Sequence, residues 1–393
     1  MAPVRVIHTS DIHLGRRFPS LDSEAEKLRT EDVLRVFNDL VDYAIKNKTH
    51  LILISGSLFD KIHPNRETVS AALRSFGRIH DALPGTRIVL TPGQEEMIVK
   101  KGGEADCSLT IFDHLNYVSV IGAGNNPESI NLEFDGQKII VSSCQAALFF
   151  DEEFKKRDIP APKDRAGIFI LCTYSRRQDL INITNDLLRE RILAPLRERG
   201  YQYVALGHRH KLDLIEAGDF TAIYPGSLER FNFDDDRERK CFITFTIEDG
   251  RAQSPQTVRT SARPLEYINL TCSVDDKDIE GAFSDLVKRG GKDKILYAVL
   301  NGQSTFEAFN KFQKSGLLAK LREKFAFVHI ENRLALVDES ADFKFEALRV
   351  GSPAEEFKRF VGREILGAKE RGDEVKLLEE LYEMGLREIE ENK

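Results

Sequence analysis

The segment LILISGSLFD, residues 51–60, has the pattern of a buried strand that ends in a polar turn. Its aliphatic run stops at Gly56, and Ser57 and Asp60 follow. Five more short apolar runs in the first half of the chain end similarly: VRVIHTS (4–10), RIVLTPG (87–93), KIIVSSC (138–144), GIFILCT (167–173) and YVALGH (203–208). Segments with helical spacing, residues 31–47 and 66–79, lie between the first three strands. This alternation predicts a layered α/β core with largely parallel pairing and with its chemistry at the carboxyl ends of the strands.

The composition is that of an ordinary soluble globular protein. The 393 residues suffice for two or three folding units, and no stretch resembles a secretory signal or a membrane span. We therefore expect a cytoplasmic protein without a membrane association. The formal charge of −7 argues against nucleic-acid binding through the overall field of the protein, so any such contact is expected to be local. The five cysteines are scattered without a C-x-x-C pair, which predicts reduced thiols.

The pattern changes in the second half of the chain. A stretch that contains proline, AQSPQTVRTSARP (252–264), is interpreted as a linker, which gives a first domain of residues 1–263. Residues 264–349 then alternate strand and helix as a small βαβαβ unit. Residues 350–393 contain two amphipathic helices, with apolar positions at Phe357, Phe360, Leu378 and Leu381. These helices either pack on the body of the protein or dock on the helices of another protein.

Two pairs of candidate metal ligands stand at predicted strand ends. The first strand ends in SDIHLG, where Asp11 and His13 are two residues apart, and a later strand ends in LGHRHK, with His208 and His210 at the same spacing. On an extended chain, residues at this spacing share a face, so that both side chains of a pair can reach one ion. A single such residue is usually only solvated, but two pairs at the ends of buried strands favour a metal site.

At this point the chain resembles a known family. The motifs SDIHLG, SGSLFD, TPGQEE and LGHRHK are similar to the D-x-H, G-D-x-x-D, G-N-H-D/E and G-H-x-H motifs of calcineurin-like metallophosphoesterases. Their order, and the stretch AIYPGSLERFNFDD (222–235), resemble the nuclease subunit of SbcCD-type complexes, the SbcD or meiotic-recombination-eleven family of DNA repair. The resemblance implies a layered α/β/β/α sandwich, a DNA-capping-like domain over residues 264–349, and C-terminal helices that dock on a partner.

The resemblance also implies a site for two manganese ions, whose ligand positions are only partly kept. Asp11, His13 and His210 match ligands of the first metal, and His208 matches a ligand of the second. The position of the carboxylate shared by both metals holds Ser57, whereas Asp60 matches an acid of the same motif that does not bridge. The other substituted positions are Gln94 for an amide ligand, Cys172 or its neighbour Thr173 for a histidine ligand, and Glu95 for the general-acid histidine.

These substitutions predict a weakened centre. Two divalent ions about 3.5–4 Å apart need a shared anion, which the hydroxyl of Ser57 cannot supply. Loss of a positioned general acid costs roughly 10² to 10⁴ in rate, and a glutamate is normally ionised at neutral pH. A thiol at Cys172 suits zinc better than manganese. Taken alone, Ser57 could equally be a turn residue. We therefore expect either no metal or one weakly bound divalent ion, with manganese implied by the resemblance.

The leading hypothesis is a pseudo-nuclease, an SbcD-like subunit of a double-strand-break repair complex that keeps DNA binding and partner docking. The alternative is an active metal-dependent DNA phosphodiesterase that uses one metal or a site rebuilt with Glu95, Glu96 or Cys172. A phosphodiesterase for small substrates is a third reading, which the capping unit and the docking helices disfavour.

The resemblance further implies three kinds of partner. Ser227 and Arg230 of the YPGSLER loop are the predicted DNA contacts, although a tight proline-glycine turn explains the loop equally simply. An SbcC-like ABC-type coiled-coil ATPase would be held by the C-terminal helices. A homodimer would form through helices near residues 66–79 and 107–118, although the apolar side chains of the second segment suit an internal core as well.

Overall fold

The structure is a computed structural model. It describes residues 2–337, apart from residues 20, 22, 100–104, 125, 151–158, 175–182, 218–219, 232–238, 273–278 and 315, and it also describes residues 361, 365, 382, 384 and 385. The chain separates into two compact units, Met1–Ala335 and Leu336–Lys393. Among the described helices, none has the length and apolar character needed to cross a membrane.

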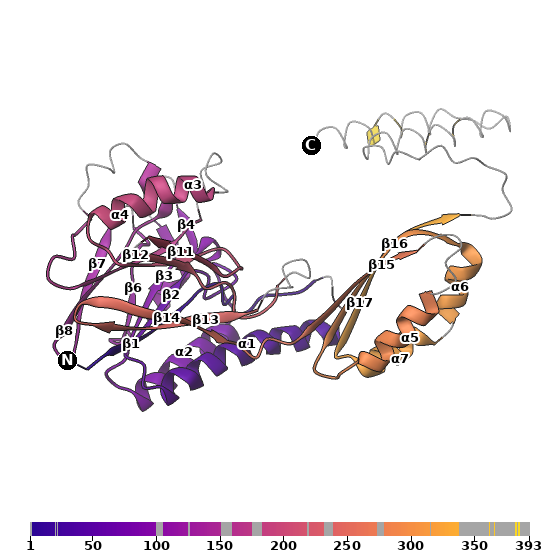
Figure 1. The fold of residues 1–393 in the computed structure, drawn as a ribbon, viewed down its shortest axis with the longest axis horizontal. Coiled ribbons are helices and arrows are strands. Elements are labelled where there is room, and N and C mark those ends of the chain that lie inside the picture. The colour runs from indigo at the N-terminus through magenta and orange to yellow at the C-terminus, as the bar shows by residue number, and fades with distance from the viewer. Residues whose placement is uncertain are drawn as a thin grey trace. The chain divides into compact units, whose positions relative to one another are not determined.

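Two six-stranded sheets form the body of the first unit (Figure 1). The first sheet has the strand order β14 (Arg251–Arg259), β13 (Cys241–Glu248), β1 (Val4–Thr9), β2 (Leu51–Ser55), β3 (Arg87–Thr91) and β6 (Val118–Val120). The second sheet has the order β11 (Asp213–Ala217), β12 (Phe220–Tyr224), β10 (Tyr203–Gly207), β9 (Ala166–Cys172), β8 (Gln137–Ser143) and β7 (Glu128–Phe134). The strands from β1 to β6 and from β12 to β8 pair in parallel, and antiparallel strands flank them. The prediction of largely parallel pairing is confirmed for the centre of each sheet.

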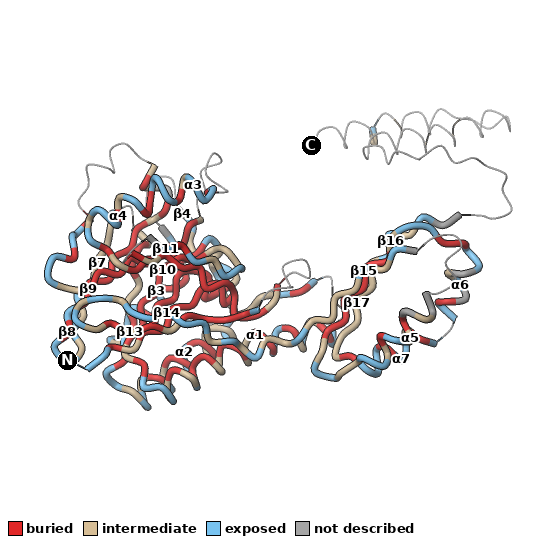
Figure 2. The backbone as a smooth tube through the Cα atoms, viewed as in Figure 1, coloured by how far each residue is buried: buried red, intermediate tan, exposed pale blue. Residues whose placement is uncertain are grey.

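Helices cover the outer face of each sheet. Helices α1 (Ser23–Lys46) and α2 (Arg66–Ala82) lie on the first sheet, and the second carries α3 (Asn185–Leu187), the π-helical turn η6 (Leu188–Leu193) and α4 (Ala194–Glu198) (Figure 1). Strand β2 shows why both faces are apolar. Leu51 and Leu53 point into the core between the sheets, whereas Ile52 and Ile54 pack toward α1 and α2. Both faces of the central strands are therefore buried (Figure 2), and the expected α/β/β/α sandwich is confirmed.

The expected linker over residues 252–264 is wrong, because most of it forms strand β14, which pairs antiparallel with β13. The strand lies at the edge of its sheet, where Pro255 need not donate a hydrogen bond to a neighbouring strand. Its register shifts opposite Thr244 and Thr246, and Ser254 adopts a φ of 51°. The proline thus marks an irregular edge strand rather than the end of the sheet.

The segment after β14 contains a three-stranded sheet with helices on one face (Figure 1). Its elements are β15 (Leu265–Cys272), α5 (Ile279–Arg289), β16 (Ile295–Thr305), α6 (Phe306–Lys314), α7 (Leu317–Lys324) and β17 (Phe327–Val337). The predicted βαβαβ pattern has one helix between its last two strands, but the structure has two, α6 and α7, since Gly316 adopts a left-handed φ of 70° between them. Apolar side chains of all three helices pack on the sheet in a separate core.

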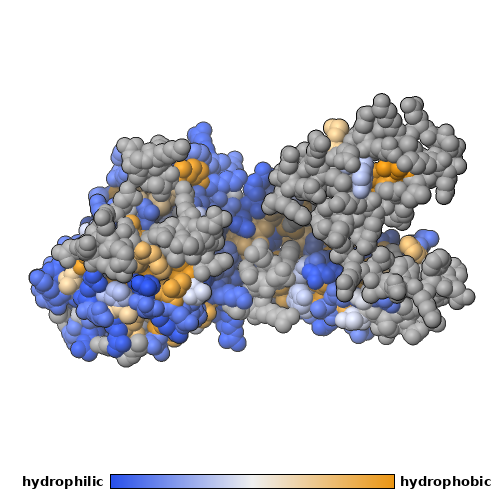
Figure 3. All heavy atoms as spheres, turned by 90° about the horizontal axis from the view of Figure 1, so that it is seen from above, coloured by the Kyte–Doolittle hydropathy of each residue, from blue (hydrophilic) through white to orange (hydrophobic). Residues whose placement is uncertain are grey.

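Shorter elements complete the first unit. They are the hairpin strands β4 (Met97–Val99) and β5 (Ala105–Cys107) and the 3₁₀ turns η1 (Gln94–Glu96), η2 (Ser108–Phe112) and η3 (Ala146–Phe150). The helix expected near residues 107–118 is only the turn η2, because Leu109 and Phe112 enter the core beside α2. The four predicted docking residues of the tail lie outside the described residues, and the domain boundaries at 263 and 349 stay predictions. On the face drawn in Figure 3, the described surface is mostly hydrophilic with smaller apolar patches.

Candidate metal centre

The carboxyl ends of strands β2 and β10, which belong to different sheets, lie in contact because a glycine stands at the end of β10. A Cβ atom on Gly207, the last residue of β10, would lie 1.5 Å from the carbonyl oxygen of Ser55, the last residue of β2. The hydroxyl of Ser55 also donates to the carbonyl of Leu206, at 2.9 Å. Only glycine at this position permits β10 of one sheet to approach β2 of the other. The loops that follow these strands therefore surround one cavity.

Unusual backbone conformations aim the loop residues into this cavity. Asp11, His13, Ser57 and His208 all have positive φ values, of 50°, 53°, 53° and 98°. Non-glycine residues rarely adopt this conformation, and such strain gathers at functional sites. The loops after β1 and β2 brace each other, since the N–H of Asp11 donates to Gly56 and that of His13 donates to Ser57, at 3.1 and 2.8 Å. The expected extended spacing of Asp11 and His13 is wrong in its geometry, although both side chains reach the same place.

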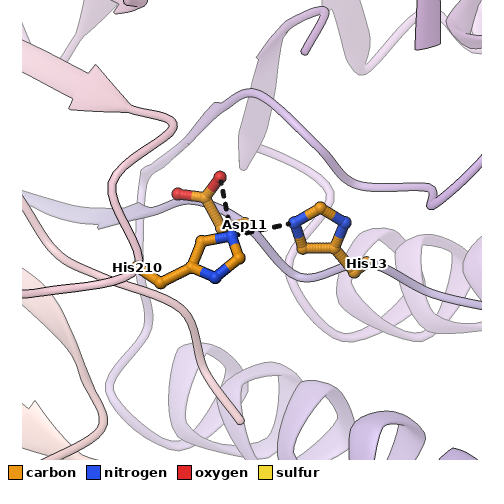
Figure 4. A group of neighbouring side chains, drawn as sticks. All are labelled: Asp11, His13 and His210. Carbon is orange, nitrogen blue, oxygen red and sulfur yellow. Dashed lines mark hydrogen bonds and ion pairs between the residues drawn. The ribbon is translucent and has the colours of Figure 1, made fainter. Parts of the chain in front are cut away.

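Three of the predicted ligands converge on one point (Figure 4). The ligand atoms of Asp11, His13 and His210 lie within 4.8 Å of one another. The Nε2 atoms of the two histidines are 3.3 Å apart, and Nε2 of His210 is 4.0 Å from Oδ1 of Asp11. Within the described part of the chain, this is the one group of three histidine, cysteine or acidic side chains with such spacing. The structure therefore brings these three residues together, and their role as metal ligands stays a prediction.

The two carboxylate oxygens of Asp11 differ in their surroundings. Its Oδ2 accepts from the hydroxyl of Ser10 at 2.6 Å and from the N–H of His208 at 3.1 Å. Its Oδ1 is buried and has no hydrogen-bond partner among the residues that the structure describes. Burial raises the pKa of the Asp11 carboxyl, an effect that the neighbouring histidines and hydrogen bonds only partly offset. A buried acidic oxygen of this kind is suited to a cation.

His13 is oriented by a carboxylate behind it. Its Nδ1 lies 2.9 Å from Oδ1 of Asp60, which also accepts from Arg16 at 3.0 Å. A histidine that donates through one nitrogen presents the lone pair of the other to a metal. Burial would lower the pKa of His13, but the hydrogen bond to Asp60 and nearby acids raise it above its ordinary value. The sequence analysis assigned Asp60 to the same motif, but it did not predict that Asp60 would orient His13.

His210 and an unpredicted aromatic ring complete this part of the site. Burial, together with the charges of His13, Lys240, Arg16 and His208, lowers the pKa of His210 to about 3, so its imidazole is neutral at physiological pH. The ring of Phe231 lies edge-on to both His13 and His210, with centroids 4.9 and 5.4 Å away. Phe231 was missed because an apolar residue after the YPGSLER stretch is indistinguishable in sequence from ordinary core.

The positions that the sequence predicts to be substituted lie around the other part of the cavity. Ser57 donates its hydroxyl to Oε2 of Glu95 at 2.9 Å. The carboxylate of Glu96 is fully buried and accepts from the backbone N–H groups of Ser57, Phe59 and Gly93, at 2.8–3.0 Å. Burial raises the pKa of Glu96 to about 7. Glu96 therefore ties the loops after β2 and β3 together.

The remaining predicted ligands of the second metal do not join the cluster. Gln94 is exposed, and His208 reaches Asp11 through its backbone N–H. Cys172 is buried, and burial, reinforced by nearby acids, raises the pKa of its thiol well above the ordinary value. The hydroxyl of Thr173 donates to the carbonyl of Gly207 at 3.0 Å.

The two predicted DNA contacts are turned inward. The Ser227 side chain is fully buried, and its hydroxyl donates to the carbonyl of Glu229 and accepts from Lys240. The Arg230 guanidinium donates to the carbonyl of Arg263 at 2.7 Å. Their role in DNA binding stays a prediction. Basic side chains that do line the cavity are Arg16, Arg209 and Lys211.

The donors fit one divalent ion. The cavity has a volume of about 560 Å³ and contains Asp11, His13 and His210 together with Ser57, Glu95 and His208. One carboxylate and two imidazoles suit manganese, iron or zinc, and such an ion would supply Lewis acidity at this edge of the sheets. The α/β/β/α sandwich is the metallophosphoesterase fold, and Asp11, His13 and His210 at its strand ends form a group that could hold a metal ion.

Sequence comparisons define the family within that class. The chain is 35% identical over 320 residues to DNA double-strand break repair protein Mre11 of Saccharolobus solfataricus, which covers 76% of each protein. It is 20% identical over 361 residues to the protein of the same name from Archaeoglobus fulgidus, covering 86% of this chain and 76% of that protein. The chain belongs to the Mre11/SbcD family.

Other comparisons are less specific. No protein-family model matches the chain. A solved structure of purple acid phosphatase PPD1 from yellow lupin overlaps 66% of this chain and 54% of that protein, with a TM-score of 0.39 and 10% identity.

Proposed function

We propose that this protein is a DNA-binding subunit of a double-strand-break repair complex whose manganese-dependent nuclease activity is lost or strongly impaired. The observation that carries the proposal is the hydrogen bond from Ser57 to Glu95, at the position where the family resemblance implies a carboxylate shared by two metals. A neutral hydroxyl that is already committed to a neighbouring acid cannot bridge two cations. Without the bridge, the attacking and leaving oxygens of a phosphodiester are not held by a metal pair.

The surroundings of the cavity support the same proposal. The general-acid position carries Glu95, which is bound to Ser57 rather than poised over a substrate. The candidate histidine-ligand position carries a buried Cys172 whose thiol stays protonated, because burial raises its pKa. The proposed DNA contacts are the cavity-lining Arg16, Arg209 and Lys211, together with the YPGSLER loop, whose residues would contact DNA only after rearrangement. Positive side chains beside the cavity suit phosphate oxygens.

A cleavage assay tests the proposal directly. End-labelled DNA with blunt and recessed ends is incubated with Mn²⁺, with and without the ATPase partner. We expect the wild type to cleave at least about 100-fold more slowly than the combined variant Ser57→Asp, Gln94→Asn, Glu95→His and Cys172→His, since a general acid alone contributes roughly 10² to 10⁴ in rate. Robust wild-type cleavage that His210→Ala abolishes would refute the proposal.

The alternative is an active phosphodiesterase that uses one metal. The observation in its favour is that Asp11, His13 and His210 keep the geometry of a first metal site while Glu95 lines the same cavity. In this case, Glu95→Gln would abolish a measurable wild-type cleavage of single- or double-stranded DNA. The same assay therefore separates the two candidates.

The partner proposal concerns residues 264–393. The three-stranded unit is proposed to act as the DNA-capping-like domain, and residues 350–393 to hold an SbcC-like ATPase. Pull-down of that ATPase by the full chain and by a chain truncated at Val350 tests the second part. We expect truncation to remove binding, whereas equal recovery of the ATPase would assign docking to another surface. The homodimer expected through residues 66–79 and 107–118 is tested by measuring the mass of the full chain in solution.

A further inference from the structure

Ser57 and Glu95 form a pair whose geometry is fixed from several sides. The backbone N–H of Ser57 donates to Glu96, its carbonyl accepts from His13, and its hydroxyl donates to Oε2 of Glu95 at 2.9 Å. The backbone of Gly93 also packs closely, since a Cβ atom there would lie 2.3 Å from the Ser57 hydroxyl oxygen. The hydroxyl is therefore held in one direction, toward the Glu95 carboxylate.

A carboxylate at residue 57 would conflict with Glu95. Its oxygens would extend from the place where the hydroxyl now lies 2.9 Å from Oε2, so two like charges would stand in contact. The acid at residue 95 is thus compatible with the hydroxyl at residue 57, and it is not compatible with the carboxylate that the family pattern would place there.

The charge in the cavity then matches one dication. Of the acids that line it, Asp213 pairs with Arg209 at 3.4 Å, which leaves Asp11 and Glu95. Neither makes a salt bridge with lysine or arginine among the residues that the structure describes. The two carboxylates balance the charge of one divalent ion, whereas a second ion would add to the positive charge that the cavity-lining Lys211 already carries in a half-enclosed space.

We infer that Glu95, held by Ser57, is the relocated second acidic group of the site, and that together with Asp11 it retains a single divalent cation beside His13 and His210. This inference rests on the proposed function and adds a ligand-supporting role for a residue at the general-acid position. Glu95 lies outside the group of atoms that are within 4.8 Å of one another. It acts on the ion through the field in the cavity or through a coordinated water, as a positioning residue.

Manganese titration of the full-length protein tests the inference. The electron paramagnetic resonance signal of free Mn²⁺ gives the number of bound ions and the dissociation constant without any catalytic readout. We expect one ion per chain and at least about 10-fold weaker binding by Glu95→Gln, which is the usual cost of removing a supporting group. Ser57→Ala should weaken binding about 5-fold, because it frees the Glu95 side chain. The matched control is Glu133→Gln, an exposed glutamate on β7, which should bind as the wild type does.

Combined variants test the dependence between the two residues. Ser57→Ala with Glu95→Gln should bind no more weakly than Glu95→Gln alone, since the serine acts through the glutamate. Ser57→Asp should still bind at most one ion, and a second ion should appear only when Glu95→His is added. Thermal melting of each metal-free variant shows that it is folded.

The inference is overturned if Glu95→Gln binds Mn²⁺ as tightly as the wild type, if the wild type binds no ion or two ions, or if the two single effects simply multiply. These outcomes differ from a failure of the proposed function. DNA cleavage by the wild type would refute the pseudo-nuclease proposal, but the finding of one bound ion would still hold. Unchanged Mn²⁺ binding by Glu95→Gln would refute the role of Glu95, but a lack of DNA cleavage would still support the proposed function.

Discussion

The two sides of the cavity use their polar atoms in opposite ways. On the first side, the loops after β1 and β10 contribute Asp11, His13 and His210, whose ligand atoms converge on one point. Within the described part of the chain, the buried Oδ1 of Asp11 has no hydrogen-bond partner. We name this the β1/β10 side. On this side, a bound cation would interact with the buried Oδ1 of Asp11 and with the two histidine nitrogens.

The second side consists of the loops after β2, β3 and β9, and we name it the β2/β3/β9 side. Its polar groups are bonded to one another, because Ser57 donates to Glu95, three backbone N–H groups donate to Glu96, and Thr173 donates to a carbonyl. Here the protein satisfies its own hydrogen-bonding groups. The comparison teaches that a polar side chain with a hydrogen-bond partner inside the protein is a poorer ligand than one without, because a cation must then compete with that partner.

The strongest test of the comparison removes the buried acid of the β1/β10 side. We expect Asp11→Asn to weaken Mn²⁺ binding by at least about 100-fold, because it deletes the anionic ligand. The metal-free variant should be no less stable than the wild type, since burial raises the pKa of Asp11 and so shows that the folded state disfavours its charge. Mn²⁺ titration and thermal melting without metal measure the two effects. Binding within threefold of the wild type would show that the two sides do not differ as described.

The strands that build this arrangement are predictable from sequence, but the loop conformations are not. The apolar runs predict β1, β2, β3, β8, β9 and β10, because burial on both faces leaves a clear pattern. The strand β7 was missed, since its partly exposed residues interrupt that pattern. The edge strand β14 was interpreted as a linker, because it contains Ser254 and Pro255, which are typical of loops. Patterns of hydrophobicity thus identify central strands better than edges.

The sequence predicts which residues come together at the candidate site, but it does not predict the loop conformations that bring them together. Asp11 and His13 converge with His210 through positive φ values, not through an extended chain, and this conformation leaves no mark in residue spacing. His208 and His210 do not act as a pair of ligands as the sequence predicts. His210 places its side chain in the cluster, whereas His208 contacts Asp11 through its backbone N–H. Phe231 could not be recognised, since nothing in the sequence brings it against two histidines that are 21 and 218 residues away.

A stability test addresses the β2/β3/β9 side. We expect Glu96→Gln to lower the free energy of unfolding by about 2–3 kcal/mol, because an amide NH₂ group would face a backbone donor that now has a carboxylate oxygen. Urea unfolding at neutral pH without metal measures the effect. The control Glu133→Gln should change stability by less than about 0.5 kcal/mol. If Glu96→Gln instead abolished Mn²⁺ binding without a loss of stability, Glu96 would belong with the metal-binding groups.

A third test concerns His8, which lies beneath both sides. Its ring nitrogens are 2.9 Å from the hydroxyl of Tyr203 and 2.8 Å from that of Ser55. Burial lowers the pKa of His8 from 6.5 to about 3, against a weaker opposing effect of a backbone hydrogen bond. The unfolded chain therefore takes up a proton that the folded protein refuses, and stability falls as the pH falls from 6.5 toward 3.

This linkage should cost about 2 kcal/mol between pH 7 and pH 5. Urea unfolding of the metal-free wild type and of His8→Asn at both pH values measures it, and the variant should lose that part of the pH dependence. A variant in exposed His63, His63→Asn, should keep the full dependence. Equal pH dependence in His8→Asn and the wild type would mean that His8 is not held neutral by the fold.

The smallest effect on metal binding is expected at Cys172, because the comparison of the two sides predicts that this residue is not a ligand. Its sulfur packs against the backbone after β2, since a Cβ atom on Gly56 would lie 2.8 Å from Sγ. Burial raises the pKa of the thiol well above its ordinary value, so the thiol is protonated when no metal is bound. We expect Cys172→Ala to change Mn²⁺ affinity by less than about twofold, because manganese prefers oxygen and nitrogen donors. Zinc provides the stricter measurement, since a thiolate would favour it. A tenfold loss of Zn²⁺ affinity in Cys172→Ala would show that the β2/β3/β9 side still contributes a ligand, because the metal would then displace the proton that burial retains.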